Sequence, residues 1–148
     1  MVTLEPITRE NLRAVVALQP RDDQSNFVAP NAISIAEVYV EPTCTPLALA
    51  ADGQLVGFTL LCRETETGID WIIRFMIDQH HQGKGYGRAG LLAVIERLRA
   101  SADYQETRLS YVPGNAVAEG LYRAVGFEAT GQVDHGEIIM RLVEPTVG

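Results

Sequence analysis

The sequence predicts a mixed α/β domain with an antiparallel front half and one parallel strand pair in its later half. The chain has 148 residues, a length that suits one domain spanning 1–148 with one hydrophobic core. Two apolar runs separated by Asp52-Gly53 are typical of an antiparallel hairpin. From Gly68 onward, an apolar run, a glycine-rich loop, a helical pattern and another apolar run follow in turn. Such a strand-helix-strand unit joins parallel strands.

The composition sets limits on the partners of the chain. Its formal net charge is −7, which disfavours nucleic acid and anionic membranes, because both attract cationic surfaces, and is compatible with a cationic substrate. No apolar run reaches the roughly 20 residues of a membrane-spanning helix, and the first residues do not resemble a signal peptide. Cys44 and Cys62 make neither a disulfide framework nor a CxxC motif. We therefore expect a cytoplasmic protein with reduced cysteines and no membrane or nucleic-acid partner.

The first third of the chain is predicted to form a strand and two short helices. Thr8 is a suitable N-cap for a helix, and Ser34 with Glu37 fits the S-x-x-E capping box of a second helix. Between them, a polar segment flanked by Pro20 and Pro30 favours a loop. The ranges expected here are a strand at 2–7, a helix at 9–18, a loop at 19–30 and a short helix near 31–40.

The middle and the end of the chain alternate between strand and helix patterns. The segment "GIDWIIRFMID" is so apolar that we expect a strand buried on both faces. Gly90 lies early in the next helix, where a close contact would explain a residue of low helix propensity. The ranges expected here are a hairpin at 46–61, a strand at 68–78, a helix with an apolar stripe at Leu91, Val94, Ile95, Leu98 and Ala102, a strand at 107–113, a helix at 115–125 capped by Asn115 and ended by Gly126, a small strand near 128–130 and a last strand at 136–143.

The segment "HQGKGYGRAG", from His81 to Gly90, carries four glycines at the start of a predicted helix. Helix N-termini leave amide N–H groups unpaired and carry a partial positive charge, so this segment favours an anion such as a phosphate. A Walker loop is disfavoured, because Gly83-Lys84 is followed by Gly85 and not by a hydroxyl residue, and Asp78 stands in place of the first glycine.

The sequence of this loop matches two other phosphate-binding patterns. Residues 85–90 match the dinucleotide pattern G-x-G-x-x-G, and Glu106 follows about 20 residues later. An antiparallel meander precedes the loop, however, and too little chain follows for further parallel units. The segment from Gln82 to Gly87 also matches the pattern [Q/R]-x-x-G-x-[G/A] at every fixed position.

With this loop, the chain resembles the GCN5-related N-acetyltransferase (GNAT) family. A second segment, "NAVAEGLYRAVGF" from Asn115 to Phe127, is similar to the late helix of that family, with its asparagine, its Leu-Tyr pair and its Gly-Phe ending. The resemblance implies an α/β (α+β) GNAT fold, with a mixed, mostly antiparallel sheet of six or seven strands and about four helices. It also implies that strands 4 and 5 splay apart, with a bulge near Arg74 as a plausible cause.

The resemblance implies acetyl-CoA as co-substrate, with no metal. Successive amides from Gly83 to Arg88 can surround its pyrophosphate, since glycines let the backbone approach closely. Backbone groups near Phe75 would bind the pantetheine arm and polarise the acetyl carbonyl. The residues expected to bind acetyl-CoA are Phe75, Met76, Ile77, Gln82, Gly83, Lys84, Gly85, Tyr86, Gly87, Arg88 and Asn115. The pair His80-His81 lacks further residues at metal-ligand spacing.

The implied reaction is direct attack of an amine on the thioester in a ternary complex. Tyr122 is the residue of the family's late helix that protonates the leaving sulfur, although it also lies on an apolar stripe and fits simple core packing. An alkylammonium with a pKa near ~10 requires a base, and a carboxylate serves only with a raised pKa or through water. No carboxylate stands out among the candidates, which are Glu37, Glu41, Asp70 and Asp78.

The segments "NFVAPNAISIAEVYVEP" and "RFMIDQHHQGKGYGRA" are similar to the bacterial spermine/spermidine acetyltransferase branch of the family. The carboxylates Glu37, Glu41, Asp22 and Asp23 could then pair with the ammonium groups of a polyamine, and Asp70 is a further substrate-binding candidate. Acetylation of an aminoglycoside-like or peptide amine is an alternative, as is a non-catalytic acyl-CoA-binding sensor. A homodimer is compatible with the resemblance.

Overall fold

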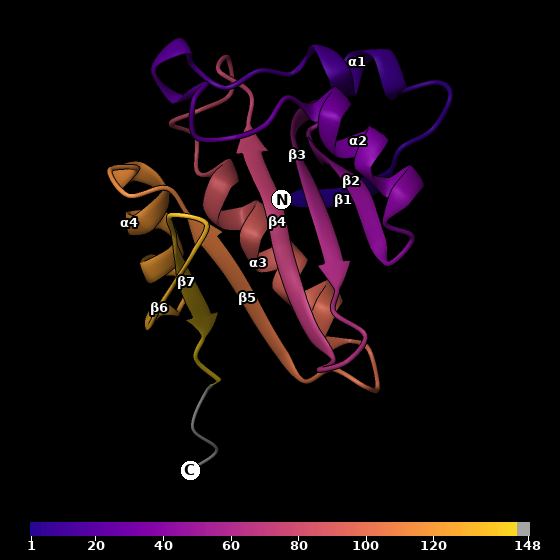
Figure 1. Ribbon diagram of the computed structural model, residues 1–148. Coiled ribbons are helices and arrows are strands. Elements are labelled where there is room, and N and C mark those ends of the chain that lie inside the picture. The colour runs from indigo at the N-terminus through magenta and orange to yellow at the C-terminus, as the bar shows by residue number, and fades with distance from the viewer. Residues whose placement is uncertain (145–148) are drawn as a thin grey trace.

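The computed structural model describes residues 1–144, which form one seven-stranded sheet with helices on both faces (Figure 1). The strand order is β1-β2-β3-β4-β5-β7-β6, and every neighbouring pair is antiparallel except β4 and β5. The predicted fold class is therefore confirmed. The elements are β1 (Val2–Pro6), α1 (Leu12–Ala17), a 3₁₀ turn η1 (Asp22–Gln24), α2 (Asn31–Val40), β2 (Cys44–Ala51), β3 (Gln54–Arg63), β4 (Ile69–Ile77), α3 (Tyr86–Arg99), β5 (Glu106–Tyr111), α4 (Ala116–Ala124), β6 (Phe127–Asp134) and β7 (Glu137–Leu142).

The hairpin of β2 and β3 turns at the predicted Asp52-Gly53. Both residues have positive φ, 51° and 78°, as a two-residue turn with the twist of a hairpin requires. The strands that leave this turn are mostly buried. The hairpin thus forms the rigid centre of the antiparallel half.

The other end of this hairpin contains a disulfide that the sequence analysis did not predict. Cys44 and Cys62 are directly opposite each other in the β2–β3 register, with their Cα atoms 3.9 Å apart, and their sulfur atoms are bonded. The expectation of reduced cysteines is wrong for this structure. Sequence spacing did not reveal the pair because strand register, and not a local motif, brings the two residues together.

Helices α1 and α2 pack on one face of the sheet, against β2, β3 and β4. Thr8 and Asn11 cap the turn before α1 reciprocally, since each backbone N–H bonds the side chain of the other residue. The predicted capping box at Ser34 is wrong, because α2 already begins at Asn31 after Pro30. The Ser34 side chain is instead buried, and its hydroxyl has no hydrogen-bond partner among the described residues.

Helices α3 and α4 cover the opposite face, where the larger hydrophobic core lies. Leu91, Val94 and Ile95 of α3 are buried as predicted, but Ala102 lies beyond the helix and is exposed. A Cβ atom at Gly90 would lie 3.1 Å from the Phe75 ring, which explains the glycine by close packing of the helix on the sheet. No helix of the described residues has the length and apolarity needed to cross a membrane.

The parallel pair of β4 and β5 is short. Residues Ile69 to Ile72 pair with Glu106 to Leu109, and the pairing stops there. One residue further, Ile73 is an extra residue opposite β3, because Leu61 pairs with Ile72 whereas Leu60 pairs with Arg74. This bulge lies beside Arg74, as predicted, and beyond it β4 and β5 diverge toward their C-terminal ends (Figure 1).

The C-terminal hairpin of β6 and β7 extends the sheet beyond β5. The small strand expected near 128–130 is in fact part of the longer strand β6, which has an irregularity between Ala129 and Val133. β7 inserts between β5 and β6, so its first residue, Glu137, comes next to the end of β5. The hairpin thus lies on the side of β5 away from β4.

Candidate active site

The glycine-rich loop leaves a row of backbone amides without acceptors. Gly83 and Gly85 have φ values of 79° and 83°, which side chains rarely tolerate, and Gly85 is the N-cap of α3. The first backbone bond of the helix runs from the Ala89 amide to the Gly85 carbonyl. The amides from Gly83 to Arg88 make no hydrogen bond to another described residue. Unpaired amides at the positive end of a helix have the geometry that suits an anion, so the prediction of a phosphate site here stays a prediction.

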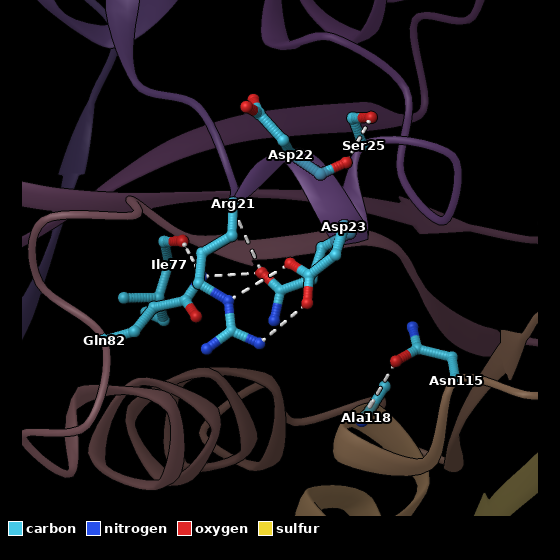
Figure 2. A network of polar contacts seen from close by, with 9 residues as sticks. Arg21, Asp22, Asp23, Ser25, Ile77, Gln82, Asn115 and Ala118 are labelled. Atoms are coloured by element: carbon cyan, nitrogen blue, oxygen red, sulfur yellow. Dashed lines mark hydrogen bonds and ion pairs between the residues drawn. The ribbon is translucent and has the colours of Figure 1, made fainter.

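Gln82 supports the beginning of this loop. Its side-chain amide donates to the Ile77 carbonyl at 3.0 Å and to the Gln24 side chain at 2.8 Å. Gln24 in turn accepts from the Arg21 backbone, so the bonds of Gln82 join the end of β4, the loop and η1 (Figure 2). Gln82 thus fixes the shape of the turn, and the loop glycines beside it are left exposed.

A cavity of about 220 Å³, the loop cavity, runs between this loop, η1 and α4. Phe75, Met76 and Ile77 of β4 line it and have no β5 partner, so this edge is free to bond an extended ligand. The loop cavity is lined by Pro20, Gln24, Phe27, Val28, Phe75, Met76, Ile77, His81, Gln82, Gly83, Gly85, Tyr86, Gly87, Asn115, Val117, Ala118, Leu121 and Tyr122.

Lys84 and Arg88 flank the loop cavity without lining it. Both side chains are exposed, and neither forms an ion pair within residues 1–144. Their charges are therefore available to a phosphate from the solvent side, in addition to the amides of the main chain.

Asn115 stands at the start of α4, on the wall of the loop cavity. Its side-chain oxygen accepts the Ala118 amide at 3.3 Å, which makes it the predicted N-cap (Figure 2). The Asn115 NH₂ group is not used by this cap and can donate to a ligand.

Tyr122 lies on α4, in the larger hydrophobic core. Its side chain is 8% exposed and packs edge-on against Phe127, with ring centroids 6.1 Å apart. Burial, and more weakly the negative charge of Glu137, raise the pKa of Tyr122 to about 12. The tyrosine therefore keeps its proton at neutral pH. Core packing, one of the two roles considered for Tyr122, is confirmed, and because the residue also lines the loop cavity, contact with a ligand stays a prediction.

A second cavity of about 310 Å³, the gap cavity, opens between β4 and β5. It shares Phe27, Val28, Phe75 and Tyr122 with the loop cavity, so the two meet at the gap between the strands. The remaining residues that line the gap cavity are Asn26, Ala29, Ile72, Ile73, Arg74, Ser110, Tyr111, Val112 and Glu137.

The four carboxylates considered as bases do not line either cavity. Glu37 contacts Arg74 at 3.5 Å, and Glu41 is exposed at the end of α2. Asp78 is buried and accepts the backbone amides of Gln19 and His80. Through these bonds, Asp78 holds the loop after α1 against the end of β4.

Asp70 lies in the paired half of β4 and is away from both cavities. It is buried and forms a bidentate ion pair with Arg63, with both distances 3.0 Å. Hydrogen bonds to Asp70, and then to Asp103, raise the pKa of the Arg63 guanidinium. The structure thus gives Asp70 a structural partner and does not bring it together with the other predicted site residues.

Glu137 and Ser110 are gap-cavity residues that the sequence analysis missed. The motif-free segment "HGEIIMRL" gave no reason to select a glutamate at the start of a strand. Only the pairing of β7 with β5 brings Glu137 beside the gap. Asp22 and Asp23, by contrast, are exposed on η1, where Asp23 pairs with Arg21 at 3.1 Å.

This combination of fold and site defines a class of protein. A family model described as the acetyltransferase (GNAT) family matches residues 12–127, and the chain belongs to that family. It is accordingly an acetyl-CoA-dependent N-acetyltransferase. The dinucleotide-binding alternative is excluded by the sheet, which has one parallel pair where that fold would have several.

Two curated relatives cover nearly the whole chain. A probable spermine N(1)-acetyltransferase of Bacillus subtilis subsp. natto is 28% identical over 94% of this chain and 96% of its own length. A spermine/spermidine N(1)-acetyltransferase of Bacillus subtilis strain 168 is 27% identical over the same shares.

Two solved structures have the same fold. The AAC(6')-Ib structure in complex with paromomycin and acetyl-CoA has a TM-score of 0.80 at 21% identity, and covers 95% of this chain and 92% of its own. The spermidine N-acetyltransferase of Vibrio cholerae in complex with CoA and spermine has a TM-score of 0.74 at 17% identity, with the same shares covered. At 21% and 17% identity, these two likenesses show a shared fold alone.

Proposed function

We propose that this protein transfers the acetyl group of acetyl-CoA to a primary amine of a polyamine such as spermidine or spermine. The observation that carries the proposal is the meeting of two cavities at Phe75 and Tyr122. One cavity offers unpaired amides to a pyrophosphate, and the other offers a carboxylate to an amine. Both curated relatives are named for polyamine acetylation, which favours this class of amine.

The loop cavity suits the thioester substrate. Amides from Gly83 to Arg88 would hold the pyrophosphate, with Lys84 and Arg88 adding charge from outside. The free edge of β4 at Phe75, Met76 and Ile77 would bond the pantetheine arm, and an amide there would polarise the acetyl carbonyl. The thioester would then lie at the gap between the strands, where the two cavities meet.

The proposed chemistry is direct attack of the neutral amine on the thioester carbon in a ternary complex. The carbon–nitrogen bond forms, the carbon–sulfur bond breaks, and the leaving sulfur takes a proton from Tyr122. Its raised pKa keeps this tyrosine protonated until the step occurs. The nitrogen loses one proton to solvent or to a carboxylate, and a proton from solvent restores Tyr122, so that the step balances.

A thiol-release assay with an amine panel tests the proposal. Acetyl-CoA would be offered with spermidine, spermine, kanamycin and short peptides, and kcat/KM compared. We expect the two polyamines to have the highest values. Preferred turnover of an aminoglycoside, which the likeness to AAC(6')-Ib makes the second candidate, would contradict the polyamine assignment. Binding of acetyl-CoA without turnover of any amine would contradict the whole proposal.

A further inference from the structure

The gap cavity contains one carboxylate whose charge is not compensated by a cation. Glu137 accepts a hydrogen bond from the Ser110 hydroxyl at 3.1 Å and forms no ion pair within residues 1–144. The other charged residue of the cavity, Arg74, already contacts Glu37 and donates to the Ile73 carbonyl at 3.0 Å. The cavity therefore has an available negative charge at the Glu137 side.

The position of Glu137 is set by the sheet and not by a flexible loop. It is the first residue of β7, after the tight turn at His135-Gly136, both of which have positive φ. β7 pairs with β5 through Tyr111↔Ile138 and Ser110↔Ile139, so the Glu137 side chain meets Ser110 across the two strands. One carboxylate oxygen is used by Ser110, and the other is free for a ligand.

Glu137 is also close enough to the proposed reaction centre to affect it electrostatically. Its charge contributes to the raised pKa of Tyr122, and both residues line the gap cavity. An ammonium group held at Glu137 would thus share the gap cavity with Tyr122, which also lines the loop cavity. No other carboxylate of the described residues lines the gap cavity.

We infer that Glu137, held by Ser110, is the residue that binds the cationic acceptor amine in the gap cavity. The inference rests on the proposed function for the identity of the reaction, and it names the group that selects a primary ammonium. A carboxylate bonded to a charged donor contributes more than a neutral hydrogen bond, so its removal should weaken amine binding strongly. Binding of acetyl-CoA, which uses the loop cavity, should be unaffected.

The experiment compares Glu137→Gln with a matched control, Asp134→Asn. Asp134 is on the same hairpin, but its side chain is exposed and contacts His135 without lining the cavity. Kinetics with spermidine and acetyl-CoA would be measured for both variants. We expect Glu137→Gln to raise KM for spermidine by about tenfold or more, with little change in kcat or in KM for acetyl-CoA. Asp134→Asn should change each value by about twofold at most.

A binding measurement keeps this test separate from turnover. Calorimetric titration of spermidine into the protein saturated with CoA should give a Kd that rises by the same factor in Glu137→Gln. Glu137→Asp, which keeps the charge, should recover part of the affinity, and thermal melts would confirm that each variant is folded. If wild type binds spermidine and Glu137→Gln does not, the inference stands even where the amine panel contradicts acetyl transfer to polyamines.

Three results of the binding and control measurements would overturn the inference, and one kinetic result would do so as well. They are an unchanged spermidine Kd in folded Glu137→Gln, an equal loss in Asp134→Asn, and no binding of spermidine by wild type. A fall in kcat with KM unchanged would also overturn it, because Glu137 would then act in the chemical step and not in binding the amine.

Discussion

The two halves of β4 have different tasks. From Ile69 to Ile72 the strand is paired on both sides, and the Arg63–Asp70 ion pair anchors its start. Beyond the extra residue Ile73, from Arg74 to Ile77, it is paired with β3 alone, and residues 73–77 line one or both of the cavities. The bulge at Ile73 separates these halves. The paired half therefore contributes stability, and the unpaired half keeps its backbone groups for a ligand at the cost of sheet pairing.

The bulge is fixed from the β3 side. The Thr59 hydroxyl is fully buried and donates to the Arg74 carbonyl at 2.7 Å, immediately after the extra residue. A buried donor that loses its acceptor destabilises a fold by about 1–3 kcal/mol, so this bond holds Arg74 in the bulged conformation. The separation of the two strands is thus an ordered feature of the fold.

The largest effect is expected on the unpaired side. Tyr122→Phe keeps the ring that packs on Phe127 but removes the hydroxyl at the gap. We expect kcat to fall by about 10²- to 10³-fold, because general acid catalysis contributes an effect of this size. The melting temperature and the Kd for CoA should change little. A kcat close to wild type would show that Tyr122 only packs.

A substitution in the paired half of β4 should lower stability and leave kcat unchanged. Asp70→Asn removes one partner of a largely buried ion pair and leaves Arg63 with Asp103 on the surface. We expect a loss of about 3 kcal/mol in the free energy of unfolding, measured in urea, with kcat retained in the folded fraction. If the variant instead lost affinity for the amine without any loss of stability, Asp70 would be a substrate-binding residue and this prediction would be wrong.

A pH titration tests the burial of Tyr122. Its folded pKa of about 12 lies above the ordinary value of 10, so its contribution to stability is complete below pH 10. As pH rises from 10 to 12, the unfolded state loses this proton first, and the free energy of unfolding falls by up to about 3 kcal/mol. Tyr122→Phe should lack this part of the decrease when the two unfolding curves are compared across that range. Parallel curves would mean that Tyr122 is not buried in solution.

The smallest effect is expected from the exposed cations of the loop. Lys84→Ala and Arg88→Ala each remove a solvent-exposed charge, which contributes about 1 kcal/mol or less. We expect the Kd for CoA to rise by about fivefold at most, and less at high salt, in a calorimetric titration. A rise of about a hundredfold in the Kd for CoA would show that these side chains, and not the main-chain amides, bind the pyrophosphate.

Sequence reasoning succeeded where the determinants are local. The Asp52-Gly53 turn, the Asn115 cap and the glycine-rich loop are short patterns with their own backbone requirements, and all three appear where they were expected. Their order along the chain was sufficient for the fold class. The bulge beside Arg74 was inferred from the family resemblance, and the β3–β4 register contains it.

The features that were missed depend on strand register. The Cys44–Cys62 bond and the Glu137–Ser110 contact each join residues on neighbouring strands, and neither partner belongs to a motif. Tertiary contacts also explain why the candidate carboxylates chosen from the sequence do not line the cavities. Asp70 meets Arg63 across the β3–β4 register, and Glu37 meets Arg74 only because α2 packs on the sheet. Charge in a sequence shows that an ion pair is available, but not which residue completes it.

The central claim is that unpaired amides of the loop bind the diphosphate of a thioester substrate. Amide ¹H–¹⁵N spectra recorded during a titration with CoA test it directly. We expect the largest shift changes at Gly83, Gly85, Tyr86, Gly87 and Arg88, with smaller ones along the free edge of β4. Largest changes elsewhere on the molecule, with these amides unmoved, would contradict the account.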